Sequence, residues 1–598
     1  MALRPDRERS RLRSWLPLGV ITVLFVALGI YYSVASPIWE APDEPGHFGN
    51  VYHIAQSGKL PGPGTFYTWH QSPLYHIIAA QIVRLVDMPD LAEWTRFNPN
   101  ATIKGQSDEP NVAFHSVREL PPYQQVALGV HVARWVNVFF GAVTVILTYW
   151  LARKLFPAQT WVAVGAAGLV AFNPQFIFMS AAVQNDVPLA MAFTMTLLPA
   201  LNIVQGDRRA RQFLWLGAMV GLAIIFKQSG IVLIGLAGLV VLWAVWQSRK
   251  WSKLPVWGGL SGLTLALVAG PMYLRNTLLY GDPFAYQVYK SLHPPVEPIQ
   301  LAQVTGDMYI AYFQRMHRSF WGYFGWLTVP FPDWIYHVLW LLYPLAVLGL
   351  ALWLYNGRST WAPARGGLAA VALLGLGMIL VWAFVIRYTL SFGPFGVQGR
   401  YLFQMISAQA ILISLGLLSL LPGRLRAAPV AITLSALLVL ASWAPAGLIA
   451  PTYEYLGDLP QVLDGIQFQR ADVFGDAIEL AGYSTHIDLE SGQLGVTLYW
   501  RTLNSPVDDY TVFVHLIDAQ GNLVSQQDRR PLDGRFPTDM WRPGDVMHTD
   551  HLLQASDTCL AAPCYLAVGF YDWETGQRLP VTEGVAQNDA VLLREGLR

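Results

Sequence analysis

The sequence predicts a polytopic α-helical membrane protein of about eleven spanning helices, followed by a C-terminal β-sandwich domain outside the cytoplasm. Three observations support this prediction. The 598-residue chain is 54% hydrophobic and only 13% charged, whereas about 25% of the residues of an ordinary soluble protein are charged. Apolar runs long enough to span a bilayer recur up to about position 450. Beyond that point, short alternating runs are separated by turn residues.

The net charge of zero conceals an asymmetry along the chain. From Ala450 onward there are 22 acidic and 9 basic residues, against 17 acidic and 30 basic residues before it. Together with the composition, this excludes a single soluble globule and a disordered chain. It also excludes a nucleic-acid-binding protein with a basic face, so no nucleic acid is expected as a partner.

The first apolar run, residues 15–35, follows an arginine-rich start. A signal peptide would have a shorter apolar core and a small-residue cleavage site, so we interpret the run as a retained helix with a cytoplasmic N-terminus. Ten further apolar runs are centred on about residues 127–152, 162–182, 187–205, 213–227, 230–246, 255–274, 335–355, 366–387, 401–421 and 428–449.

The short loops between alternate spans support this orientation, because cytoplasmic loops are rich in Lys and Arg. All five predicted cytoplasmic turns are basic: Arg153–Lys154, Gly206–Gln212, Gln247–Lys253, Gly357–Arg365 and Gly423–Arg426. An odd number of spans then places the C-terminal domain outside the cytoplasm. We therefore expect a multi-pass protein of the cell (plasma) membrane, with the lipid bilayer as a partner.

Two segments on the predicted outer side are long, about residues 36–125 and about 275–333. Long ordered segments on one face are where a membrane enzyme carries its chemistry. The predicted transmembrane domain covers residues 1–450, including these loops, and the predicted extracytoplasmic domain covers residues 451–598.

The C-terminal domain has the pattern of a β-sandwich. Its length of about 130 residues is typical of that fold, and three runs alternate between apolar and polar residues: 495–500, 510–516 and 565–571. Trp500 and Tyr571 fit either a core or a sugar-binding surface, and we favour the core. Cys559 and Cys564 are the only cysteines. In an exported domain they predict a local disulfide, with two unpaired thiols as the alternative.

The chemistry is expected just after the first helix, in the segment Ser36–Asn50. Asp43 and Glu44 lie there at the predicted membrane surface, with His47 one helical turn further on. Adjacent carboxylates beside a low-dielectric boundary are costly unless they have a partner or a task. From these residues alone, a positioned catalytic site and a charged helix cap are equally good interpretations.

Other motifs follow in order along residues 1–450: His70–Tyr75, Gln184–Asp186, Lys227, Arg275–Asn276 and Gly396–Tyr401. With the Asp-Glu pair and the His-Phe that follows it, this series resembles the GT-C membrane glycosyltransferases. The closest similarity is to the protein O-mannosyltransferase and aminoarabinose-transferase type. The resemblance implies transfer of a hexosyl or pentosyl unit, with inversion, from a polyprenyl-phosphate carrier to an acceptor at the outer membrane face.

The resemblance also assigns roles to individual residues. Asp43 matches the proposed catalytic base, which removes the proton of the acceptor hydroxyl. Glu44 and Asp186 would orient the acceptor or bind a divalent cation, Mg or Mn. No compact His/Asp cluster in the sequence settles the metal, so no cofactor is certain.

The leaving lipid phosphate needs cationic partners. The candidates are Lys227, Arg275 and Arg400, although a Lys or Arg at a helix end also snorkels to water, which is the favoured interpretation of Lys227 alone. Arg400 is the strongest candidate. The remaining substrate-binding candidates are His47, His70, Gln71, His76, Asn185, Asn276 and Tyr401.

Two rival functions use the same architecture. A lipid-linked-sugar flippase or transporter would show internal repeats and polar residues at the bilayer midplane, and the ionisable residues here cluster at predicted external span ends. A ligase that transfers a whole glycan would share the geometry of a glycosyltransferase. The acceptor, a protein, lipid or polysaccharide, is not revealed. The C-terminal domain is expected to guide it, with Trp541 or Trp573 as exposed aromatic residues.

Overall fold

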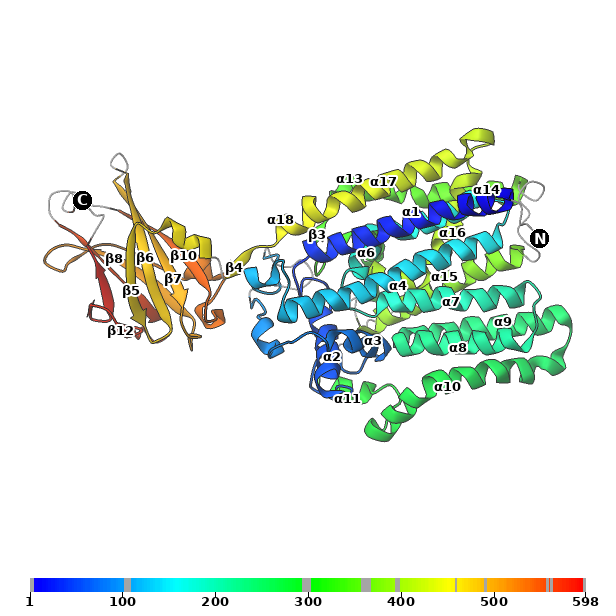
Figure 1. Ribbon diagram of the computed structural model, residues 1–598, viewed down its shortest axis with the longest axis horizontal. Helices are drawn as coiled ribbons and strands as arrows, with labels where there is room; N and C mark the ends of the chain where they lie inside the picture. The colour runs from blue at the N-terminus through cyan, green and yellow to red at the C-terminus, as the bar shows by residue number, and fades with distance from the viewer. Residues whose placement is uncertain are drawn as a thin grey trace. The chain divides into compact units, whose positions relative to one another are not determined.

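The computed structural model describes residues 5–99, 101, 109–292, 303–356, 367–392, 398–457, 460–488, 492–554, 559 and 563–594. The chain forms two compact units (Figure 1). The helical unit ends at Thr452, and the β-rich unit contains Tyr453–Arg598 together with residues that precede α4. The prediction of a polytopic helical protein with a C-terminal β-sandwich is confirmed.

Long apolar helices make up most of the helical unit. In chain order the helices are α1 (Pro5–Ala35), α2 (Glu44–Ser57), α3 (Leu74–Val83), α4 (Gln125–Leu155), α5 (Thr160–Ala171), α6 (Pro174–Ser180), α7 (Asp186–Val204), α8 (Ala210–Phe226), α9 (Val232–Ser248), α10 (Leu254–Tyr280), α11 (Tyr286–Ser291), α12 (Gly306–Trp321), α13 (Asp333–Trp340), α14 (Leu342–Asn356), α15 (Gly367–Phe392), α16 (Ile406–Ser419), α17 (Ala428–Ala444) and α18 (Ala450–Thr452). A 3₁₀ segment, η7 (Gly399–Met405), precedes α16.

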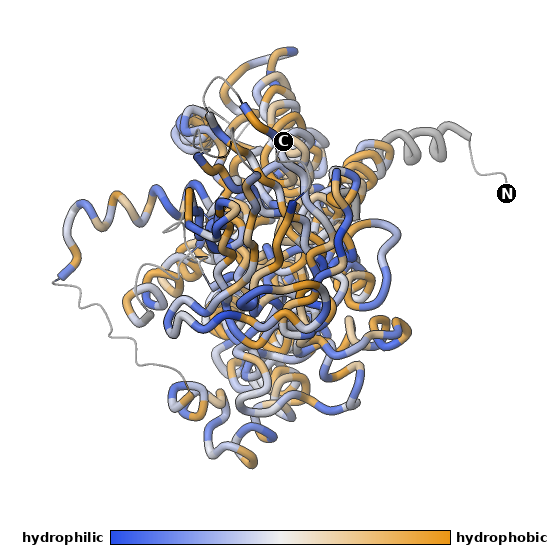
Figure 2. Tube along the Cα trace, turned by 90° about the vertical axis from the view of Figure 1, so that its left-hand side faces the viewer, coloured by the Kyte–Doolittle hydropathy of each residue, from blue (hydrophilic) through white to orange (hydrophobic). Residues whose placement is uncertain are grey.

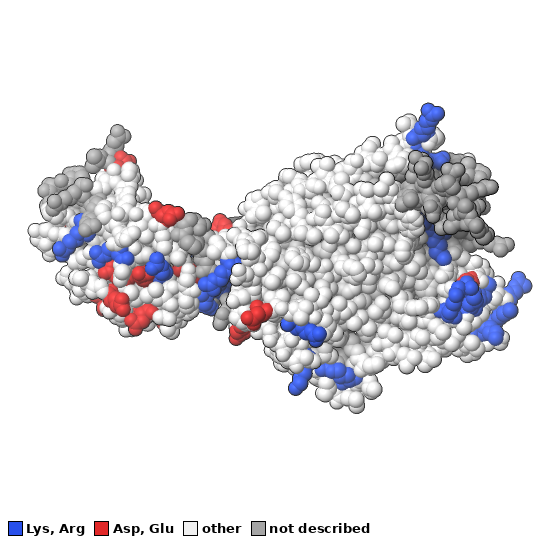
Figure 3. Space-filling view, in the orientation of Figure 1, with Lys and Arg blue, Asp and Glu red and all other residues white. Residues whose placement is uncertain are grey.

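Each of the eleven predicted apolar runs contains helix, but fewer than eleven meet the length and hydropathy needed to cross a membrane. Within the described ranges nine spans qualify, or ten if the bent pair α5 and α6 counts as one. These two helices meet at 59°, where Asn173 caps α6 and Pro174 begins it. The helix α8, with 17 residues, is shorter than a full span. A wide belt of the helical unit's surface lacks charged side chains (Figure 3).

The predicted outer segments contain the short helices α2, α3, α11 and α12. Glycine allows close packing in α2: a side-chain carbon at Gly46 would lie 2.7 Å from Tyr67, and one at Gly49 would lie 2.3 Å from Phe66. The segment between α2 and α3 therefore packs directly on α2. The predicted turn at 357–365 and the residues Gly396 and Val397 lie outside the described residues.

The β-rich unit contains two five-stranded sheets, in the orders β10-β7-β6-β5-β12 and β13-β14-β11-β8-β9. Buried apolar residues of both sheets form the core of this unit, and hydrophobic residues occur along the tube of this end of the molecule (Figure 2). The bounds of the strands are β5 (Phe468–Phe474), β6 (Ile478–Asp488), β7 (Gln493–Thr502), β8 (Tyr510–Ile517), β9 (Leu523–Arg529), β10 (Val546–Gln554), β11 (Tyr565–Asp572), β12 (Val581–Glu583), β13 (Ala586–Gln587) and β14 (Ala590–Leu593). Three short pieces, β1 (His115–Ser116), β2 (Tyr323–Phe324) and β3 (Val329–Pro330), precede β4 (Tyr455–Gly457).

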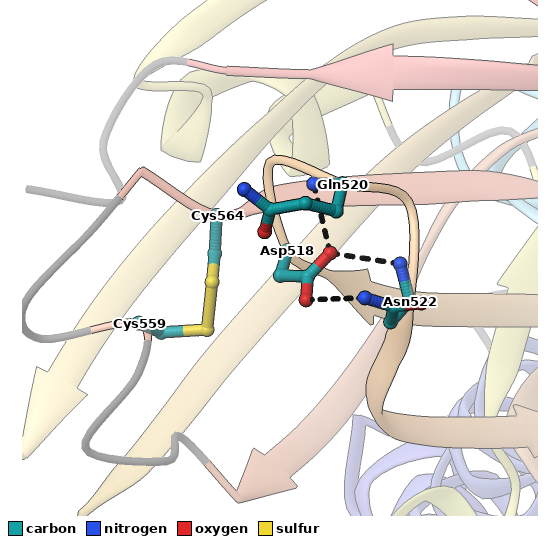
Figure 4. Close-up of a disulfide and its surroundings, with 5 residues drawn as sticks. All are labelled: Asp518, Gln520, Asn522, Cys559 and Cys564. Atoms are coloured by element: carbon teal, nitrogen blue, oxygen red, sulfur yellow. Dashed lines mark hydrogen bonds between the residues drawn. A yellow bond between two sulfur atoms is a disulfide. The ribbon is translucent and has the colours of Figure 1, made fainter.

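The three predicted alternating runs correspond to β7, β8 and β11. Trp500 is fully buried in the core of the β-rich unit, as favoured, and Trp541 is buried there too. Trp573 is 63% exposed, so it is the aromatic residue of the predicted pair that lies at the surface. The predicted disulfide between Cys559 and Cys564 is present (Figure 4).

Candidate active site

Asp43 lies in the connection between α1 and α2, immediately before α2. Its backbone is left-handed, with φ 67° and ψ 0°, a conformation that non-glycine residues rarely adopt. The carboxylate does not cap the helix. It accepts a hydrogen bond from Arg400, whose Nη2 lies 2.5 Å from Oδ2, while 34% of the Asp43 side chain stays exposed. Asp43 is therefore fixed by an ion pair and still open to a substrate.

The pKa values of Asp43 and His47 are shifted in ways that set their charges. Burial raises the pKa of Asp43, but the positive charges of Arg400 and Lys227 hold it below its usual value. Asp43 is thus ionised at neutral pH. Burial also lowers the pKa of His47 to about 3, against the opposing effect of Asp43. The His47 ring is therefore neutral.

A second histidine, His76 of α3, stacks against His47. The ring centroids are 5.1 Å apart, and His47 Nδ1 lies 2.8 Å from His76 Nε2. Burial, with the nearby His47, lowers the pKa of His76 well below its usual value. The two neutral rings can share one hydrogen bond, in which one nitrogen donates and the other accepts.

Arg400 joins Asp43 to a second carboxylate. Its Nη1 lies 3.8 Å from Asp186 Oδ2, and Lys227 Nζ lies 2.5 Å from Asp186 Oδ1. We call Asp43, Asp186, Lys227 and Arg400 the charge cluster. The ring of Tyr401 lies beside it, 5.7 Å from Lys227 Nζ and 5.6 Å from Arg400 Cζ. The Arg400 Nε is buried without a hydrogen-bond partner in the described part of the chain.

The position of Arg400 is fixed by the close packing of Gly399 on α12. The backbone N–H of Gly399 donates to Ser319 Oγ over 2.7 Å. A side-chain carbon at Gly399 would lie 2.3 Å from the Phe320 nitrogen and 2.4 Å from the Met316 oxygen. Only glycine fits there without backbone movement, so α12 sets where the guanidinium of the next residue lies.

Glu44 has a different environment from its neighbour Asp43. It is fully buried and pairs with Arg134 of α4, whose Nε and Nη2 lie 2.8 and 2.6 Å from the two carboxylate oxygens. The same carboxylate accepts the backbone N–H groups of Trp39 and Val183. Its acceptor capacity is largely used by these four bonds, and they tie the α1–α2 connection to the turn before α7.

Arg134 strengthens this junction, because it also donates to backbone carbonyls at the end of α1. Its Nη1 lies 2.9 Å from the Ser33 oxygen and 2.7 Å from the Ser36 oxygen, and Nη2 lies 2.9 Å from the Pro37 oxygen. The guanidinium is fully buried. Sequence analysis did not single out Arg134. The sequence does contain a sign of its role: Arg134 is a lone arginine in the apolar run 127–152. An arginine buried in such a run has to be paired.

Arg275 does not join the charge cluster, although it was predicted to bind phosphate together with Arg400. It lines a pocket at the end of α10 with Asn276, Tyr280, His70 and Gln71. We call this the Arg275 pocket. Lys227, the weakest of the three predicted cations, lies in the cluster instead.

The pocket and the charge cluster are connected by side chains. Asn185 Nδ2 donates to Gln71 Oε1 over 2.8 Å, and Asn185 immediately precedes Asp186 of the cluster. His76, which stacks on His47, also lines the pocket. The predicted site residues therefore fall into two adjoining groups.

The carboxylates predicted to hold a divalent cation do not form a metal site in the described ranges. No group of three or more His, Cys, Asp or Glu side chains is suitably placed there. Asp43 and Asp186 are paired with cations of the charge cluster, and Glu44 is paired with Arg134. These donors face cationic side chains and do not fit a common metal ion.

One family model matches part of the helical unit. Residues 129–273 match the family model described as dolichyl-phosphate-mannose-protein mannosyltransferase. The search of curated proteins returned no match. The matched segment runs from α4 to α10 and includes Arg134, Asp186 and Lys227.

Solved structures give weaker similarities. ArnT from Cupriavidus metallidurans aligns in the apo state with 14% identity and a TM-score of 0.41, over 69% of this chain and 61% of that one. Its complex with undecaprenyl phosphate aligns with 18% identity and a TM-score of 0.35, over 67% and 60%. The S. cerevisiae Pmt1-Pmt2 complex bound to the sugar donor aligns with 17% identity and a TM-score of 0.31, over 52% and 36%. The chain thus spans about three fifths of ArnT. Over residues 129–273, the family-model match confirms the predicted resemblance to the protein O-mannosyltransferase type.

Proposed function

We propose that the protein transfers a sugar from a polyprenyl-phosphate carrier to an acceptor hydroxyl at the outer face of the membrane, with the charge cluster as the catalytic centre. The observation that carries this proposal is the shared Arg400: one buried guanidinium contacts Asp43 and approaches Asp186. A carboxylate base and cations for a leaving phosphate thus lie within one site. The match to a dolichyl-phosphate-mannose family model supports the same chemistry.

In this proposal Asp43 is the general base. The acceptor oxygen forms a bond to the anomeric carbon while its proton passes to the Asp43 carboxylate. The bond from the anomeric carbon to the phosphate oxygen breaks, and its electron pair leaves with the carrier phosphate. A single displacement of this kind inverts the anomeric configuration. The ionised state and partial exposure of Asp43 suit it to this role.

Arg400 and Lys227 stabilise the charge that develops on the leaving phosphate. Arg400 Nε is available for this contact because it has no partner among the described residues. A phosphate that draws Arg400 away from Asp43 also removes the charge that lowers the pKa of Asp43. Donor binding thereby makes Asp43 a stronger base at the moment when the base is needed.

We assign roles to the other two carboxylates, Glu44 and Asp186, from the contacts that each of them makes. Glu44 is assigned to positioning, because its oxygens are bonded to Arg134 and to two backbone N–H groups. Asp186 is assigned to holding Lys227 and Arg400 in place. Only Asp43 then acts on the acceptor proton.

The proposed orientation keeps the N-terminus in the cytoplasm and the β-rich unit outside it. Lys and Arg lie at both ends of the helical unit (Figure 3), so the proposed orientation rests on the basic short loops of the sequence. The disulfide in the β-rich unit is typical of an oxidising compartment.

Transfer is tested with the full chain in lipid vesicles, a radiolabelled polyprenyl-phosphate sugar and a panel of hydroxyl acceptors. Asp43→Asn is expected to reduce sugar transfer by about 10²–10⁴-fold, the usual contribution of a general base. Asp87→Asn, at an exposed carboxylate after α3, is the matched control and should retain wild-type transfer.

The same vesicles separate the rival functions. A flippase would move labelled lipid between leaflets without forming a glycosylated product, and a ligase would accept only carriers that bear a longer glycan. Wild-type transfer by a correctly folded Asp43→Asn protein would remove Asp43 from the mechanism.

A further inference from the structure

The helix α12 has an apolar side and a polar side along its length. Residues four and seven positions apart share a helix face, so Tyr309, Phe313 and Phe320 lie on one side of it. By the same spacing, Gln314 and Arg318 lie together on another side. A helix with this pattern either packs its apolar side on protein or inserts it into a membrane surface.

The second half of α12 packs on protein and supports the charge cluster. The Phe320 ring lies 5.5 Å from that of Phe403 in η7, between centroids. The Phe320 carbonyl accepts a hydrogen bond from Asn173 Nδ2 over 3.1 Å. Ser319 Oγ, in the same turn, accepts the backbone N–H of Gly399. This half of the helix is therefore part of the support that places Arg400.

The first half of α12 continues the apolar side but leaves it uncovered. Tyr309, Ile310 and Phe313 are 49%, 58% and 42% exposed. Three large apolar side chains within two turns form a patch that is costly to leave in water. Tyrosine is also a residue that is enriched where a membrane protein meets the lipid headgroups. The composition of the patch therefore fits a lipid surface.

Contacts with α15 show that the patch continues the lipid-facing surface of the helical unit. The Phe313 ring lies 5.8 Å from that of Trp382, between centroids, and Trp382 belongs to the candidate span Gly367–Ser391. In the same span, Ile379 and Ile386 are 64% and 41% exposed. Arg387 is exposed little more than one turn beyond Trp382, and an arginine near a span end reaches the headgroups. Phe313 thus meets α15 just below the headgroup level.

We propose that α12 is an interfacial helix, whose first half inserts Tyr309, Ile310 and Phe313 at the boundary between headgroups and acyl chains. Its partner is the lipid surface on the side of the membrane that carries the charge cluster. Because α12 is one continuous helix, insertion of its first half holds its second half against Gly399. Contact with the bilayer thereby steadies Arg400, whether or not the protein performs the proposed reaction.

Insertion is measured by electron paramagnetic resonance of spin-labelled protein in phosphatidylcholine vesicles. The two cysteines form a disulfide, so a label on an introduced cysteine reports on that position alone. The test variant is Tyr309→Cys, and the matched control is Ala311→Cys, on the opposite face of the same turn and also exposed. Oxygen, which dissolves in lipid, should relax the label at 309 more strongly than a water-soluble nickel chelate does, with the reverse order at 311.

Two results of this measurement would overturn the proposal. Equal access of the nickel chelate to both labels would show that the first half of α12 lies in water. A label at position 309 that is shielded from both reagents would show that a protein surface, such as a second copy of the chain, covers the patch.

Coupling to the site is measured by hydrogen exchange of the full chain in lipid nanodiscs. In Tyr309→Gln/Ile310→Gln, segment Gly399–Met405 should exchange roughly tenfold faster, the factor expected when burial of one apolar side chain is lost. Tyr309→Phe/Ile310→Leu keeps the patch apolar and should exchange as the wild type does. Leu278→Gln/Leu279→Gln, at side chains of α10 that are 76% and 59% exposed, removes lipid-facing surface elsewhere and should also leave this segment unchanged.

Unchanged exchange in the Tyr309→Gln/Ile310→Gln protein would show that α12 does not transmit membrane contact to Gly399, and the proposal would be wrong. Equal acceleration by the Leu278→Gln/Leu279→Gln control would contradict it as well, since the effect would then be a general loosening of the helical unit. Neither measurement uses sugar transfer. If the transfer assay fails while insertion and coupling are observed, the proposed function is wrong and the role of α12 stands.

Discussion

The helical unit and the β-rich unit use charge differently. In the helical unit, ion pairs such as Arg134–Glu44 and Lys227–Asp186 are buried or nearly so. In the β-rich unit, pairs such as Arg501–Glu479 and Arg529–Asp533 lie mainly at the surface, around a core of aromatic and aliphatic side chains. The Arg96–Asp545 pair of this unit is buried, but it joins only one cation to one carboxylate. Buried charges are costly and need a partner or a task. What distinguishes the helical unit is therefore the linked group around Asp43, in which two carboxylates and two cations contact or approach one another.

The largest expected effect comes from breaking the fully buried Arg134–Glu44 ion pair. Arg134→Met leaves the Glu44 carboxylate buried without its partner, which should destabilise the helical unit by about 3–5 kcal/mol. Thermal unfolding of the detergent-solubilised protein measures this loss. The double variant Arg134→Met/Glu44→Leu removes both charges and should recover part of it. A single variant as stable as wild type would contradict the structural role of this pair.

A smaller effect is expected on the pH response of Asp43. Its lowered pKa keeps the carboxylate ionised at neutral pH, and the base form is lost only as the pH falls through that lowered pKa. In Arg400→Gln the main opposing charge is gone and burial raises the pKa, so protonation should occur at a higher pH than in the wild type. Infrared titration of the carboxyl stretch, with Asp43→Asn subtracted, follows this without activity. An unshifted titration would show that Arg400 does not control Asp43.

The smallest effect is expected at the surface of the β-rich unit. The Arg501 and Glu479 side chains are 43% and 14% exposed, and such pairs contribute about 0–1 kcal/mol. Arg501→Gln should therefore change the free energy of unfolding by less than about 1 kcal/mol, as measured by denaturant titration of the full chain. If Arg501→Gln lowered the free energy of unfolding as much as Arg134→Met does, the proposed difference between the two units would be wrong.

Periodicity predicted most of the fold. Apolar runs located the helices and alternation located β7, β8 and β11, because both patterns are local. The break at Pro174 was missed: the run 162–182 is continuously apolar, and hydropathy does not respond to a 59° bend. Hydropathy also did not show whether α8 crosses the membrane. The apolar composition continues to the end of this helix, which is shorter than a full span.

The candidate site was predicted in part. Motif order identified Asp43, Asp186 and Arg400, which the structure brings together. It could not separate Arg275 from them, because residues at the same ends of different spans can still lie in different cavities. Arg134 was missed because its partner Glu44 is 90 positions away, and one sequence without its fold gives no sign of that pairing.

The left-handed backbone at Asp43 restricts which amino acids this position can accept. Glycine, asparagine and aspartate tolerate that conformation best, whereas longer or β-branched residues are strained in it. Of the two acidic side chains that serve as general bases, aspartate is thus the one that the local backbone favours, and a glutamate at this position would be strained. Substitutions that keep the backbone unstrained, Asn and Gly, remove the acid, so the conformation that suits Asp43 also makes its loss easier than its exchange for glutamate.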